Sequence, residues 1–186
     1  FIRQYEALET PLYYTYMTGW EKLFELAPTI LMLNMLILGV VVAGIFSGEF
    51  SMKADAVFFS SCHGRGAAVR AKLLAGFVTV TGVYWIVWGL YTGIVLGILG
   101  ADGADCMIQT GDTGWKSFYN ISYGQLYWIV TLGGYVGTLF LMFVTMLVSA
   151  WAKSAVPAVV APFVLLFVPG FLSGSSWPVV SKVLGL

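Results

Sequence analysis

Long runs of apolar residues, separated by short polar stretches, dominate the sequence. Four of these runs contain no charged residue: 26–48, 73–100, 126–152 and 156–172. At 1.5 Å per helical residue, about 20 apolar residues cross a hydrocarbon core of roughly 30 Å. The pattern therefore predicts an all-α fold, a polytopic transmembrane helix bundle with four visible spans. We expect it to form a single transmembrane domain over residues 1–186.

Two of the predicted spans have unusual features. The run 73–100 would measure about 42 Å as one helix, so we expect it to tilt or to protrude from the bilayer. The run 156–172 contains three prolines, which predict a kinked or broken helix: Pro157, Pro162 and Pro169.

Composition agrees with a membrane protein. Hydrophobic residues make up 59% of the chain and charged residues only 10%, whereas soluble domains carry about 25% charged residues. Four long apolar helices in a soluble protein of this length would leave nothing to form a polar surface. The nine basic and nine acidic residues cancel, so no strongly basic surface indicates binding to nucleic acid.

The charges in the connecting segments predict the orientation. The segment 49–72 is basic, whereas the loop 101–125 has Lys116 against three aspartates. The positive-inside rule places 49–72 in the cytoplasm and 101–125 outside. The amino-terminal segment and residues 173–186 then also lie outside. This orientation predicts a further helix before and after the chain, which would make six.

The segment 49–72 is too polar to span a membrane and too apolar for an ordinary loop. If residues 50–61 form a helix, its apolar positions fall on one stripe: Phe50, Ala54, Val57 and Phe58. Such a helix either rests in the lipid interface or docks into a groove of a partner protein. The residues alone leave both interpretations open.

Glycines recur every four residues in the second predicted span, at Gly89, Gly93 and Gly97. This spacing places them on one helix face and predicts close packing of two helix backbones in lipid. The alternative is that glycine is simply frequent in membrane helices.

The sequence lacks the motifs of several enzyme classes. It contains no Gly-x-x-x-x-Gly-Lys-Ser/Thr loop, no His-Glu-x-x-His and no Gly-x-Ser-x-Gly, which argues against ATP binding, metalloprotease activity and serine hydrolysis. His63 is the only histidine, so we predict no metal site. Adjacent residues on a helix do not face each other, so Cys62 and His63 do not indicate catalysis. We expect no enzymatic activity and no bound cofactor.

The predicted spans carry almost no strongly polar groups. Asn34 is the exception, besides hydroxyls and tyrosines. Carriers coupled to protons or ions normally keep an acid or a base inside the bilayer. If the protein transports a cargo, we therefore expect an amphipathic or hydrophobic one.

The segment 49–72 also resembles the corresponding segment of ATP-binding-cassette (ABC) permeases of the type-2 exporter class. The resemblance lies in an acid closing one span, an amphipathic helix, and Gly-Arg before a basic start of the next span. In this sequence these are Glu49, Ser60-Ser61, Gly64-Arg65 and Ala71-Lys72-Leu73. The Met52-Lys53-Ala54 portion matches less closely. The order of spans and loops is also similar over most of the chain.

This resemblance implies a six-helix permease subunit in a cell membrane, of the bacterial plasma membrane type. Its partners would be cytoplasmic ATP-binding-cassette subunits, which bind ATP and Mg²⁺, a second permease copy or paralogue, and membrane lipid. Residues 50–61, with Phe50, Lys53 and Val57, would form the coupling helix. Phe58 and Phe59 would be its apolar plug in a cleft of the ATPase, because buried aromatic residues are typical interface anchors.

The resemblance also assigns roles to the ends of the segment. Glu49 would be a conformationally important acid, Gly64-Arg65 a terminating turn, and Lys72 the anchor of the next span. Each has a plainer interpretation: Lys72 and Arg70 satisfy the positive-inside preference, and Glu49 is solvated or paired with Arg65 or Lys72. The alternative function is a non-transporting membrane anchor, assembly factor or sensor whose loop lies on lipid.

Overall fold

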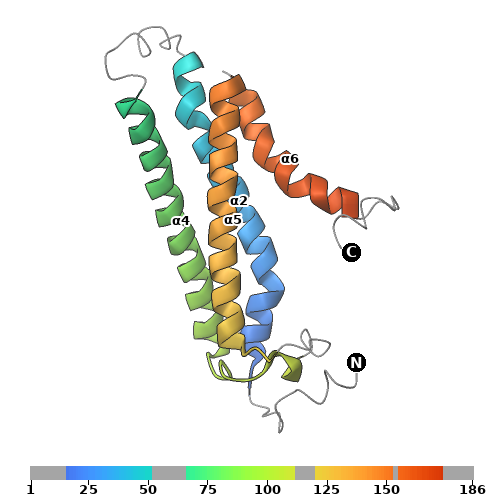
Figure 1. Ribbon diagram of the computed structural model, residues 1–186. Helices are drawn as coiled ribbons and strands as arrows, with labels where there is room; N and C mark the ends of the chain where they lie inside the picture. Colours follow the sequence, from blue (N-terminus) through green and yellow to red (C-terminus); the bar gives the residue numbers. More distant parts are fainter. Residues whose placement is uncertain (1–15, 52–65, 112–119, 153–154, 174–186) are drawn as a thin grey trace. The chain divides into compact units, whose positions relative to one another are not determined.

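The structure, a computed structural model, describes residues 16–51, 66–111, 120–152 and 155–173. These residues form four α-helices and one short 3₁₀ helix, η1, at Ile108–Thr110. The α-helices are α2 (Thr18–Ser51), α4 (Ala67–Leu99), α5 (Tyr123–Ala152) and α6 (Ala155–Ser173) (Figure 1). In the described residues the only strand-like feature is an isolated bridge between Met107 and Ser122. The predicted all-α fold is confirmed.

Three helices are long and apolar enough to cross a membrane, namely Thr18–Ile45, Ala68–Leu99 and Tyr123–Ala152. They cover all but the last residues of the first two predicted spans and the whole of the third. In α6 the apolar stretch among the described residues is shorter, Val159–Val168, so a fourth crossing stays a prediction. Large apolar side chains are exposed on all four α-helices, as expected for surfaces that lipid covers.

The helices extend beyond the apolar runs from which they were predicted. α2 begins at Thr18 rather than at residue 26, and α4 begins at Ala67 rather than at residue 73. The added turns are rich in alanine, glutamate, lysine and arginine, which favour helix. At its other end α2 continues to Ser51, so Glu49 lies inside the helix. Glu49 and Phe50 therefore lie in the last turn of α2, and the rest of the predicted coupling helix, residues 52–61, lies outside the described residues.

Local signals fix two helix ends. Before α5, the Ser122 hydroxyl accepts a hydrogen bond from the Gln125 amide, and the Gln125 side chain accepts one from the Ser122 amide, both 3.3 Å. This reciprocal pair is a capping box. After α4, Gly100 has a φ of 89°, which only glycine adopts readily. A Cβ on Gly19 would collide with the Gly100 carbonyl oxygen, so α2 passes very close to this turn.

The described chain divides into two compact units. The first contains the residues up to Leu31 and from Tyr84 to Val136, and the second contains Met32 to Val83 and the residues from Gly137 onward. In each unit, segments of α2, α4 and α5 lie side by side (Figure 1).

Aromatic side chains hold the first unit together. Tyr84 donates a 2.6 Å hydrogen bond to the Thr131 carbonyl, and the Trp88 indole donates a 2.8 Å bond to the Thr131 hydroxyl. Tyr91 donates to the Leu23 carbonyl at 2.6 Å. These bonds satisfy the polar ends of rings whose remaining surface is apolar. They connect α4 to α5 and to α2. A cluster beside them closes the unit: Met17, Trp20, Cys106, Ile108 and Tyr123.

Close backbone approaches hold the second unit together. Gly39 of α2 lies against Pro162 of α6, and Gly76 of α4 lies against the end of Met146 of α5. α6 remains one helix from Ala155 to Ser173 and bends along its length (Figure 1). The prolines of this segment therefore bend the chain without breaking the helix. The buried Pro162 lies at the contact with α2.

Candidate functional site

The middle of the predicted coupling segment, residues 52–65, lies outside the described residues. The predictions for six of its residues therefore remain predictions: Lys53, Val57, Phe58, Phe59, Gly64 and Arg65. The structure does describe the two helices that enter and leave the segment. Glu49 and Phe50 lie in the last turns of α2, and Lys72 lies near the start of α4.

Lys72 connects these two helices directly. Its ammonium group donates a 3.1 Å hydrogen bond to the main-chain carbonyl of Ile45 in α2. The side chain is partly buried, and burying a charged group is costly unless it is hydrogen-bonded. A helix carbonyl has a second lone pair for such a donor. The bond joins the two helices at the base of segment 49–72.

A second side chain reaches a nearby carbonyl of α2. The hydroxyl of Ser149, in α5, donates a 2.8 Å hydrogen bond to the carbonyl of Ala43. Ser149 is fully buried. Sequence reasoning missed this residue, because a single serine between apolar neighbours gives no signal of its partner. α2 thus receives one donor from α4 and one from α5, on carbonyls two positions apart in the chain.

Ser149 belongs to a set of buried hydroxyl groups on α5. The others are Thr131, Thr138 and Thr145, each at most 2% exposed. The threonines recur every seven residues, close to two helix turns, which keeps them on one face. This spacing was the signal in the sequence that could have identified the buried face of α5.

Two buried polar groups in the second unit have no hydrogen-bond partner among the described residues. They are the Nδ2 group of Asn34 and the hydroxyl of Thr145. Asn34, which sequence analysis singled out as polar, is 4% exposed. An unsatisfied buried group costs about 1–3 kcal/mol. Not every hydroxyl on the buried face of α5 therefore makes a bond: Ser149 donates to α2, whereas Thr145 has no partner among the described residues.

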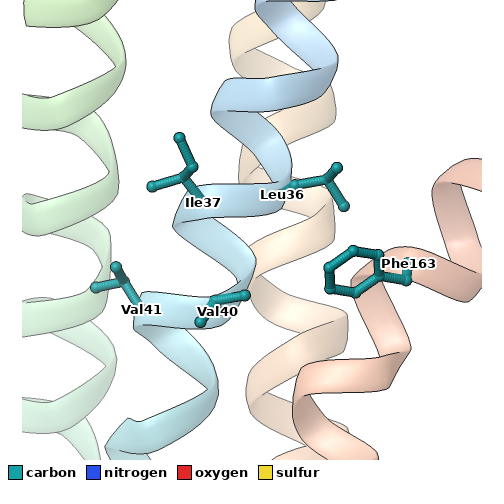
Figure 2. A pocket seen from close by; sticks show the side chains of 5 residues that line it. All are labelled: Leu36, Ile37, Val40, Val41 and Phe163. Atoms are coloured by element: carbon teal, nitrogen blue, oxygen red, sulfur yellow. The ribbon is translucent and has the colours of Figure 1, made fainter.

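An open, apolar groove lies between α2 and α6 in the second unit, with a volume of about 300 Å³. Figure 2 shows Leu36 and Val40 on the side of α2 that faces Phe163 of α6, with Ile37 and Val41 further round. These five side chains offer no hydrogen bond or charge to a ligand. The groove is suited to contact with hydrocarbon only.

The glycines of α4 are not brought against another helix in the described part of the chain. Gly89, Gly93 and Gly97 are exposed, and a Cβ on any of them would have no neighbour within 4 Å. Their predicted role in helix packing stays a prediction and would require a partner outside these residues. Two glycines of α5 do lie against side chains of α2, Gly134 at Leu31 and Gly137 at Met35.

The described residues show no cluster of three or more histidine, cysteine or acidic side chains that could hold a metal ion. Cys106 is buried and is not in a disulfide. Comparison of the chain with family models, with curated proteins and with solved structures gives no match.

Proposed function

We propose that the chain is a membrane-spanning permease subunit of an ATP-driven exporter, powered through segment 49–72 by a separate ATPase subunit. The observation that supports this most is the hydrogen bond from Lys72 to the Ile45 carbonyl. It joins the helix that enters the segment to the helix that leaves it. A force applied to the segment would therefore act on α2 and α4 together.

The strength of this connection suits such a role. Hydrogen bonds that involve a charged group contribute about 1.5–3 kcal/mol, and screening by water is weak at a partly buried site. α2 and α4 are long helices, with 34 and 33 residues, and helices transmit displacement along their length as rigid elements. Movement at the base of the segment would thus reach the membrane-embedded part of both helices.

The proposal assigns no covalent chemistry to this chain. ATP and Mg²⁺ would bind to the partner, since the sequence contains no phosphate-binding loop of its own. The cargo would be amphipathic or hydrophobic, because the exposed surfaces of α2 and α6 around the groove are apolar. A second permease copy or paralogue would complete the transporter in the cell membrane.

The alternative is a non-transporting anchor, assembly factor or sensor. The observation in its favour is the apolar stripe that a helix over residues 50–61 would have, which suits a lipid surface as well as a protein groove. The two proposals differ in whether the stripe, above all Phe58, contacts an ATPase or lipid.

Purification of the tagged chain from its native membrane in a mild detergent tests the proposal. We expect it to bring down a protein that carries a Gly-x-x-x-x-Gly-Lys-Ser/Thr loop and hydrolyses ATP. The double variant Phe58→Asp, Phe59→Asp should bring down at least tenfold less of this ATPase. Truncating an aromatic anchor costs about 2 kcal/mol or more, and about 1.4 kcal/mol corresponds to a factor of ten in affinity.

The double variant Ser60→Asp, Ser61→Asp is the matched control. It adds the same charge to the same segment at positions that are already polar, so it should retain the ATPase. Absence of an ATPase from the wild-type preparation, or its retention by the Phe58 and Phe59 variant, would support the alternative function instead.

A further inference from the structure

The bond between Ser149 and Ala43 brings a third helix to the base of the coupling segment. Ala43 lies two residues before Ile45, the acceptor for Lys72. All four residues belong to the second unit. Residues two apart on a helix are about 200° apart around its axis, which agrees with donors that come from two different neighbouring helices.

The hydrogen bond of Ser149 crosses from α5 to another helix. A serine inside a helix often donates to a carbonyl of its own preceding turn, and this hydroxyl also reaches the carbonyl of Ala43 in α2, at 2.8 Å. It is fully buried, so water does not compete for the bond. Thr145, one turn earlier and equally buried, has a hydroxyl without a partner. Of these two hydroxyls, Ser149 therefore supplies the hydrogen bond from α5 to α2.

We infer that Ser149 is a positioning residue, which fastens the end of α5 to α2 so that the third span moves with the two helices that flank segment 49–72. The inference rests on the proposed function for the source of the movement. The fastening itself is a property of this chain and is measurable without an ATPase. Three helices, α2, α4 and α5, would then respond to the segment as one body at this end.

Pairs of spin labels measure the fastening in the full chain, in nanodiscs of phosphatidylcholine and phosphatidylglycerol. Exposed positions in the second unit are available on each helix: Gly44 of α2, Leu74 of α4 and Leu147 of α5. Cysteines at Gly44 and Leu147 report the separation of α2 and α5, and cysteines at Gly44 and Leu74 report that of α2 and α4. Cys62→Ser removes the cysteine in the coupling segment.

Ser149→Ala is expected to broaden the distance distribution between α2 and α5 at least twofold, and to leave that between α2 and α4 unchanged. Thr145→Val removes a buried hydroxyl that makes no bond, with little change in shape, and should change neither distribution. Ser149→Thr keeps the hydroxyl and should give a distribution between α2 and α5 as narrow as in the wild type. If Ser149 only filled space, the added methyl group of threonine would not be expected to give this result.

Unchanged distributions in Ser149→Ala, or equal broadening in Thr145→Val, would overturn the inference. Failure of Ser149→Thr to restore the narrow distribution would also overturn it. These results are independent of the purification experiment. If no ATPase is purified but the distance distribution depends on Ser149, the proposed function is refuted. In that case Ser149 still holds α5 against α2, but no ATPase drives the movement. A bound ATPase with a Ser149-independent distance refutes the inference alone.

Discussion

Replacing Gly39 with valine is expected to separate α6 from α2 and to destabilise the second unit. A Cβ built on Gly39 lies 2.7 Å from the Cβ and 2.8 Å from the Cγ of Pro162, closer than real carbon atoms approach. The neighbour is a proline ring, which cannot rotate away as a flexible side chain would. Overpacking in a core costs about 1–3 kcal/mol, and we expect the upper end of this range in the free energy of unfolding, measured by titration with SDS.

Gly44→Val is the matched control for this prediction. Gly44 lies in the same helix and the same unit, and a Cβ there meets nothing within 4 Å. Its substitution should change the free energy of unfolding by less than about 0.5 kcal/mol, as for surface positions without special contacts. An equal loss in both variants would show that valine is disfavoured in α2 generally, and would contradict the predicted contact with α6.

Replacing Trp88 with alanine should cause the largest loss of stability in the first unit. Trp88 is 1% exposed, and its indole donates to the Thr131 hydroxyl. Its ring also lies 5.5 to 6.4 Å, between ring centroids, from three tyrosines: Tyr84, Tyr91 and Tyr127. Removal of a buried tryptophan costs about 3–5 kcal/mol because a cavity remains. The same SDS titration measures this loss.

Trp85→Ala is the control that shows whether the loss of stability comes from burial or simply from removing a tryptophan. Trp85 lies in the same helix but is 40% exposed, and its ring contacts Tyr84 and Tyr135. We expect it to lose less than half as much stability as Trp88→Ala, since much of its surface faces outward. If Trp85→Ala is the more damaging change, the described position of Trp88 in the core of this unit is contradicted.

The apolar runs predicted the helices well but their ends poorly. An apolar run marks only the part of a helix that hydrocarbon covers. The helix continues wherever the next residues favour helix, as Glu21 and Lys22 do in α2 and Arg70 and Lys72 do in α4. Only for α5 does the sequence contain a clear signal for the start of the helix, namely the capping-box residues Ser122 and Gln125. This signal was not used in predicting the helix ends.

The candidate site was predictable only in part, because its bonds end on main-chain carbonyls. Lys72 was expected to anchor α4, and the structure supplies an acceptor in Ile45. No sequence pattern predicts that the carbonyl of Ile45 is the acceptor, or that the carbonyl of Ala43 accepts a hydrogen bond from Ser149. Similarly, glycine spacing shows which residues share a helix face but not what faces them. The regular glycines of α4 are exposed, whereas the isolated Gly39 and Gly76 make close approaches.

The central claim, that segment 49–72 engages an ATPase, is tested most directly by cross-linking from Cys62. A maleimide that carries a benzophenone is attached to this cysteine in native membranes and then photolysed. Cys106 is only 8% exposed, and Cys62→Ser serves as the control for labelling elsewhere. The account predicts a cross-link between Cys62 and an ATP-binding-cassette subunit, identified by mass spectrometry and absent from the control. Cross-links to lipid alone would contradict it.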